Sequence, residues 1–245
     1  TALVALPHLC ERAPLHPGRG APYTSTSAAE ALPAYEQAVA DIRAALDWTL
    51  REHDRRRPGV APRPAIAGIS LGGLLSVIAA GIDDRFEAVV PILGGADLDV
   101  IVFRGAYRVP VERQLTETGI ELEARRRARR LYREYLEQVR RADHPLDVEA
   151  GFHFFLFDPL TFASHLRRRP ALMVSARFDP VMPRAAARQL WLELGRPEIS
   201  WVWGTHWAGG PWKPFVTARI ARFLNSILES PERTPSPGFA DVWMP

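Results

Sequence analysis

Two hydrophobic patterns alternate along the chain. Short runs of consecutive apolar residues are typical of strands that are buried on both faces, and these runs occupy residues 2–6, 64–69, 88–93, 171–176 and 199–203. Apolar residues at every third or fourth position predict helices with one buried face, and this spacing covers residues 28–53, 71–82, 121–141, 183–194 and 214–228. Strands that alternate with helices predict a single α/β domain, and 245 residues are enough to bury its core.

A short motif joins one of these strands to the next helix. Residues 68–72 read Gly-Ile-Ser-Leu-Gly, between the strand at 64–69 and the helix at 71–82. A Gly-x-Ser-x-Gly sequence in that position is the pattern of a nucleophile elbow, where Gly68 and Gly72 leave room for a sharp turn. We therefore predict that Ser70 is a nucleophile. The alternative is a flexible turn that contains glycine and has no catalytic role.

A serine nucleophile requires a base, and the base requires an acid that orients it. Asp179 follows the strand at 171–176, and His206 follows the strand at 199–203. Each has an ordinary alternative, because Asp179 could form a turn before Pro180 and a histidine between tryptophans could pack in the core. The chain order Ser, Asp, His, each directly after a strand, favours the catalytic interpretation.

From residue 2 to about residue 228 the chain resembles the α/β-hydrolase superfamily, in its serine esterase and peptidase branch. Residues 177–183 (Arg-Phe-Asp-Pro-Val-Met-Pro) are similar to its acid loop, and residues 204–206 (Gly-Thr-His) to its histidine loop. The resemblance implies an α/β fold with a mostly parallel sheet flanked by helices. It also implies that Ser70 is the nucleophile, Asp179 the acid and His206 the base, with the backbone N–H of Leu71 in the oxyanion hole.

The chain departs from the superfamily at its N-terminal side. The helix at 28–53 leads directly into the elbow strand, so residues 2–6 are expected to form the strand before that helix. The three earlier strands of the superfamily have no counterpart, and the third of them normally precedes the second oxyanion donor. We expect this sequence to be the C-terminal part of a longer protein. The alternatives are a short, catalytically impaired protein, or a replacement donor from residues 8–12.

Residues 1–229 are predicted to form the hydrolase core, with a helical lid inserted at about residues 95–169. The arginine-rich helix at 121–141 is either a solvated outer helix or a cap that attracts an anionic substrate or partner. The phenylalanines between residues 152 and 162 are expected either to line an acyl pocket or to pack in the core. The nearby histidines, His153 and His165, are expected to be structural. The proline-rich tail at 230–245 is predicted to be disordered.

Composition narrows the choice of partners and cofactors. The net charge is +3, and the basic residues are almost all arginines that alternate with acidic residues. The sequence contains no helix-turn-helix or zinc-finger pattern. We therefore expect no nucleic-acid partner. Cys10 is the single cysteine, so the chain can form no internal disulfide and no cysteine-based metal site. No phosphate-binding loop or dinucleotide fingerprint occurs, so neither a cofactor nor a metal is expected.

No apolar run is long enough to cross a bilayer, and no signal-peptide layout is visible, so a cytoplasmic location is the default expectation. The sequence therefore predicts a serine hydrolase that cleaves a small-molecule carboxylic ester or acyl substrate through an acyl-enzyme. A peptidase or amidase of the same fold would use the same three side chains. A non-catalytic protein that binds a ligand in the same place is the third interpretation.

Overall fold

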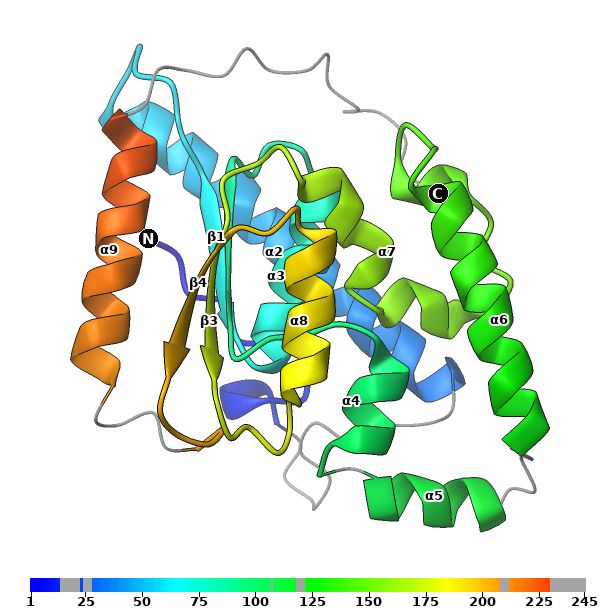
Figure 1. Cartoon of the computed structure of the whole chain (residues 1–245). Coiled ribbons are helices and arrows are strands. Elements are labelled where there is room, and N and C mark those ends of the chain that lie inside the picture. The colour runs from blue at the N-terminus through cyan, green and yellow to red at the C-terminus, as the bar shows by residue number, and fades with distance from the viewer. Residues whose placement is uncertain (14–22, 24–27, 107, 118–121, 208–211, 230–245) are drawn as a thin grey trace.

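A computed structural model describes residues 1–13, 23, 28–106, 108–117, 122–207 and 212–229 of the chain (Figure 1). Four strands form one sheet in the order β1-β2-β3-β4, and every pair is parallel. The strands are β1 (Ala65–Ile69), β2 (Ala88–Ile92), β3 (Leu172–Ala176) and β4 (Glu198–Val202). The predicted α/β fold with a parallel sheet flanked by helices is confirmed.

Helices lie on both faces of the sheet, which explains why the inner strands β2 and β3 are runs of buried apolar residues. On one face lie α2 (Ala28–Arg56), α3 (Leu71–Ile82) and α8 (Arg184–Glu193), whose apolar side chains share a cluster with Val89 and Met173 of the sheet. On the other face lies α9 (Lys213–Glu229), whose Val216 packs against Val174 and Val202 (Figure 1). All five residues of β3 are buried between these layers.

Residues between β2 and β3 form a helical insertion, as predicted for about residues 95–169. Its elements are α4 (Leu98–Arg104), α5 (Arg108–Glu117), α6 (Leu122–Val139), α7 (Leu160–Ala163) and the 3-10 turns η2 (Pro145–Asp147), η3 (His153–Phe157) and η4 (Ser164–Leu166). Figure 1 shows α6 at the right of the view, away from the sheet. Whether the insertion acts as a lid stays a prediction. The tail at 230–245 lies outside the described residues.

The phenylalanines of the insertion divide between the core and the surface. Phe155, Phe157 and Phe162 are buried, whereas Phe152 and Phe154 are partly exposed. Core packing therefore accounts for three of the five aromatic rings. His165 is close to the carbonyl of Val139, with its Nε2 at 3.0 Å, and burial lowers the pKa of its imidazole.

The predicted strand at residues 2–6 is wrong, because the structure assigns no strand to this segment. Val4 and Leu6 do pack against the main core cluster, so the apolar residues of this segment contact the core although they form no strand. A strand additionally requires a neighbour that pairs with its backbone N–H and C=O groups. Among the described residues, β1 pairs with β2 alone, and its Ala65, Ala67 and Ile69 are exposed.

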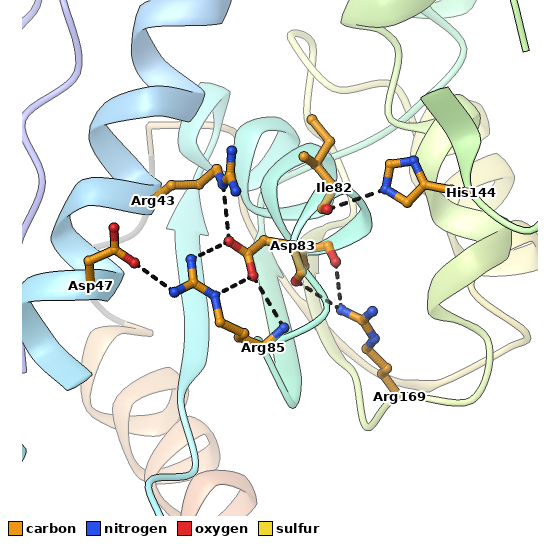
Figure 2. Close-up of polar contacts among 8 residues, drawn as sticks. Arg43, Asp47, Ile82, Asp83, Arg85, His144 and Arg169 are labelled. Atoms are coloured by element: carbon orange, nitrogen blue, oxygen red, sulfur yellow. Dashed lines mark hydrogen bonds and ion pairs between the residues drawn. The ribbon is translucent and has the colours of Figure 1, made fainter. Parts of the chain in front are cut away.

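An arginine network fixes the end of the sheet where β2 and β3 begin (Figure 2). Asp83 follows α3 and accepts hydrogen bonds from Arg43 of α2 and from Arg85, which also pairs with Asp47. Arg169, shortly before β3, donates to three backbone carbonyls, including that of Asp83. Burial opposes ionisation of Asp83, but the hydrogen bonds from the two arginines outweigh it and lower the pKa of this carboxyl.

Candidate active site

Ser70 occupies the turn between β1 and α3. Its backbone has φ 56° and ψ −117°, a strained conformation for a residue that carries a Cβ atom. Its N–H donates to the carbonyl of Ile92 at 2.8 Å, and its own carbonyl accepts from Gly73 and Leu74 at 2.8 and 3.2 Å. The turn is therefore held by β2 on one side and by the first turn of α3 on the other. This is the backbone geometry expected of a nucleophile elbow.

The two glycines of the motif have different roles. A Cβ atom at Gly68 would lie 1.9 Å from the carbonyl oxygen of Gly72, a backbone atom that cannot move aside without unwinding α3. A Cβ atom at Gly72 would have no heavy atom within 4 Å. The predicted need for a small residue is therefore confirmed at Gly68, whereas the same prediction for Gly72 is wrong.

This difference is testable with two alanine variants. We expect Gly68→Ala to lower the free energy of unfolding by about 3 kcal/mol, because the added methyl group overpacks the elbow. Gly72→Ala is the matched control and is expected to stay within about 1 kcal/mol of wild type, since alanine favours a helix interior. Urea unfolding followed by circular dichroism measures both. Equal losses in the two variants would contradict the close approach of β1 and α3.

Asp179 lies in the loop between β3 and α8 and is buried there. Its Oδ1 accepts hydrogen bonds from the N–H groups of Val181 and Met182 at 2.9 and 2.8 Å, so the carboxylate is fixed by its own loop. Its Oδ2 faces the Nδ1 atom of His206 at 2.8 Å. The predicted turn role and the predicted role as partner of His206 are thus compatible, because each uses a different oxygen.

His206 follows β4 and connects Asp179 to Ser70. A carboxylate can only accept, so the Nδ1–H of His206 donates to Asp179 and leaves Nε2 as an acceptor. The Nε2 atom lies 2.8 Å from the Ser70 Oγ, within hydrogen-bond reach of the hydroxyl. The side chain of His206 is 10% exposed and that of Asp179 2% exposed, so bulk water has little access to the bond between them. The structure brings the three predicted residues together in one hydrogen-bonded line.

The backbone N–H of Leu71 begins α3, directly after Ser70. No hydrogen bond joins this N–H to any group in the described part of the chain. An N–H group at a helix N-terminus that has no partner is suited to bind a developing negative charge. The geometry is therefore compatible with the predicted oxyanion role of Leu71.

Residues 8–12, considered as a source of a second oxyanion donor, make their polar contacts elsewhere. Cys10–Arg12 form the 3-10 turn η1, and Arg12 pairs with Asp41 of α2 and donates to the carbonyl of Ala5. No hydrogen bond or ion pair in the described residues joins this segment to Ser70. A donor role for residues 8–12 stays untested.

Two of the four tryptophans near His206 are at the surface. Trp203 is 59% exposed and Trp207 72% exposed, so ordinary core packing does not explain them. The ring of Trp207 lies edge-on to the ring of His206, with the two centroids 5.7 Å apart. Trp207 therefore adds an apolar surface beside the imidazole. Trp201 and Trp212 are half-buried.

Sequence reasoning missed the element that supports the loop of Asp179. Val100 and Ile101 of α4 share an apolar cluster with Val181 and Met182, the two residues whose N–H groups hold the Asp179 carboxylate. The sequence contained one local signal of this helix, since Asp97 caps it by accepting from the Val100 N–H at 3.2 Å. Its seven residues are too few for the helical spacing to stand out.

Within the described ranges, no group of three or more histidine, cysteine, aspartate or glutamate residues is arranged to hold a metal ion. Helices long and apolar enough to cross a membrane are likewise absent from the part of the chain that the structure describes.

Comparison with known proteins gives matches at the level of structure alone. No protein-family model and no curated protein matches the sequence. The acylaminoacyl peptidase of Pyrococcus horikoshii aligns with a TM-score of 0.51 and 17% identity, over 82% of this chain and 29% of the peptidase. The chain thus spans less than a third of the length of that protein.

Two further solved structures align with lower TM-scores. A putative non-heme bromoperoxidase, BpoC from Mycobacterium tuberculosis H37Rv, has a TM-score of 0.45 and 18% identity, over 79% of this chain and 74% of that one. Est1E from Butyrivibrio proteoclasticus has a TM-score of 0.46 and 17% identity, over 80% of this chain and 72% of that one. The likeness to the peptidase and the parallel sheet with its strand-to-helix elbow together show that the chain has the α/β-hydrolase fold.

Proposed function

We propose that this protein is a serine hydrolase that cleaves carboxylic esters through an acyl-enzyme, with Ser70 as nucleophile, His206 as base and Asp179 as the acid that orients the base. One observation carries the proposal. Ser70 Oγ, His206 and Asp179 Oδ2 are joined by two contacts of 2.8 Å each, on a strained turn that presents the serine. A serine hydroxyl is a weak nucleophile until a base within hydrogen-bond reach accepts its proton.

In the first half of the reaction, Ser70 Oγ attacks the ester carbonyl carbon while its proton passes to His206 Nε2. The carbonyl oxygen becomes an oxyanion, which the N–H of Leu71 is placed to stabilise. The imidazolium forms beside the Asp179 carboxylate, which stabilises the new positive charge. When the tetrahedral intermediate collapses, the bond to the leaving alcohol breaks, and that oxygen takes the proton from Nε2. The product is an acyl-enzyme on Ser70.

Water completes the cycle in the second half. His206 Nε2 removes a proton from a water molecule, which attacks the acyl carbon, and the bond to Ser70 Oγ breaks. The proton on Nε2 then returns to the serine, and the carboxylic acid leaves. Every proton in the cycle is carried by His206, so neither a cofactor nor a metal is required by this scheme.

The proposed preference for esters over amides is tested with matched substrates. The purified chain is assayed with a nitrophenyl acetate and with a nitroacetanilide over a range of concentrations. The two substrates carry the same acetyl group, and each releases a coloured nitroaromatic product, a nitrophenol or a nitroaniline. We expect saturable release from the ester and much slower release from the anilide, because the amine is the poorer leaving group. Equal turnover of both would favour a peptidase or amidase. Binding without turnover of either would favour a non-catalytic protein.

A further inference from the structure

Asp158 is a buried carboxylate between η3 and α7, inside the insertion, and only 2% of its surface is exposed. Its Oδ1 accepts from the N–H groups of Asp97 and Leu160 at 3.0 Å each, and its Oδ2 accepts from the N–H of Leu98 at 2.7 Å. Two of these donors stand at the beginning of α4, some 60 residues earlier in the chain. Hydrogen bonds from backbone N–H groups to a carboxylate are among the stronger ones in proteins, so Asp158 holds α4 in place from its N-terminal end.

The other end of α4 meets the loop that carries Asp179. Directly after α4, the N–H of Ala106 donates to the carbonyl of Pro180 at 2.6 Å. At Gly105 an added Cβ atom would lie 3.1 Å from the carbonyl oxygen of Val181 and 2.3 Å from that of Ile101. The end of α4 therefore lies against the backbone of the acid loop without space for a side chain.

Apolar packing along α4 also connects this helix to the acid loop. Val100 and Ile101 form one apolar cluster with Val181, Met182 and Leu74, the last from the helix that follows Ser70. Figure 1 shows α4 beside α8, the helix that follows the acid loop. A displacement of α4 must therefore move the turn after Asp179 or open a cavity in this cluster.

We propose that Asp158 is a positioning residue for the hydrolytic reaction: through α4 it fixes the turn at residues 180–182, whose N–H groups orient the Asp179 carboxylate toward His206. The inference rests on the proposed function. It assigns a role to the insertion that is independent of any lid movement. The chain of contacts runs from Asp158 to the beginning of α4, from the end of α4 to Pro180, and from Val181 and Met182 to Asp179.

The electrostatics of Asp158 are consistent with an anchoring role. Burial raises the pKa of this carboxyl to about 6, and the nearby carboxylate of Asp97 acts in the same direction, while the three N–H groups oppose the rise. Tyr132 of α6 and Tyr35 of α2 are the neighbouring phenols, and burial raises the pKa of both. A carboxylate in such surroundings is costly to ionise and depends on the hydrogen bonds from α4.

Asp158→Asn tests the proposal, because the amide keeps the shape of the side chain but replaces one accepting oxygen with an NH2 group. At least one of the three hydrogen bonds is lost. We expect kcat for ester hydrolysis to fall by about 10-fold to 100-fold with KM unchanged, since a small misplacement far from the reacting atoms is enough for such a loss. We also expect the far-downfield proton resonance of the His206 Nδ1–H to shift or broaden, because this proton reports directly on the bond to Asp179.

Asp83→Asn is the matched control. Asp83 is also a buried aspartate that accepts several hydrogen bonds (Figure 2), but it directly follows α3, whereas Ser70 directly precedes this helix. Both variants are expected to unfold at a lower urea concentration than wild type, because each removes hydrogen bonds that a buried carboxylate accepts. Asp83→Asn is expected to keep the kcat and the Nδ1–H resonance of wild type. An equal loss of kcat in both variants would show that general destabilisation is the cause and would overturn the proposal.

If Asp158→Asn does not fold, Gly105→Ala decides the question by the same two readouts. This variant disturbs the contact between α4 and the acid loop without touching Asp158, and the proposal predicts the same fall in kcat and the same change of resonance. Wild-type kcat and an unchanged resonance in a folded variant would overturn it. If the wild-type chain hydrolyses no ester, the proposed function fails, but the Nδ1–H resonance still tests the positioning role by itself.

Discussion

Ser70→Ala is expected to remove ester hydrolysis almost completely, with a fall in kcat of about 10⁶-fold. The alanine side chain has no oxygen that could form an acyl-enzyme, so what remains is the catalysis that binding and the Leu71 N–H provide without a nucleophile. The turn itself should persist, because the hydrogen bonds that hold it come from the backbone of Ser70. The free energy of unfolding is therefore expected to change little.

Ser76→Ala provides the matched control for that variant. Ser76 is a buried serine two turns further along α3, and its hydroxyl donates to the carbonyl of Gly73 at 2.8 Å. Losing this bond should cost about 1 kcal/mol of stability and leave kcat unchanged. Both variants are assayed by release of nitrophenol from the acetate ester. Residual activity of Ser70→Ala close to that of Ser76→Ala would mean that another group performs the attack.

Asp179→Asn is expected to lower kcat by about 10⁴-fold while the three side chains stay in nearly the same positions. The amide nitrogen would donate to His206 Nδ1, which would then have to be the unprotonated nitrogen. The proton would move to Nε2, and the imidazole could no longer accept a proton from Ser70. The loss therefore comes from the wrong tautomer of the base, and KM should remain close to the wild-type value.

The tautomer explanation is checked by measuring kcat and KM of Asp179→Asn beside Asp83→Asn. The second variant changes a buried aspartate that is not in contact with His206 and is expected to retain full kcat. If Asp179→Asn retained more than about a tenth of the wild-type kcat, the carboxylate would not be needed to orient the base. That result would leave Asp179 with only its turn-forming role.

The local parts of this fold could be predicted from the sequence. The elbow helix begins at Leu71 and ends at Ile82 as the apolar spacing indicated, and the strands before Ser70, Asp179 and His206 were found within two residues. The strand before Asp179 carries the strongest pattern, because all five of its residues are buried and a strand buried on both faces is continuously apolar. The positions of the three candidate catalytic residues at strand ends follow from the same patterns.

The parts that failed depend on contacts between distant segments. The apolar sequence of residues 2–6 packs against the core without forming a strand, because pairing depends on a neighbour that the local sequence cannot reveal. Asp158 and α4 were missed for the same reason, since the hydrogen bonds of Asp158 to Asp97 and Leu98 join residues about 60 positions apart. Likewise, the periodicity of apolar residues could not decide which phenylalanines of the insertion are buried.

Reaction of the folded chain with a fluorophosphonate, followed by intact-mass measurement and peptide sequencing of the adduct, tests the central claim most directly. Such a probe bonds covalently to a serine whose hydroxyl is activated by a neighbouring base. We expect a single adduct on Ser70, which disappears in Ser70→Ala and forms much more slowly in Asp179→Asn. A folded chain that forms no adduct, or forms it on another serine, would contradict the assignment of Ser70, His206 and Asp179 as the catalytic residues.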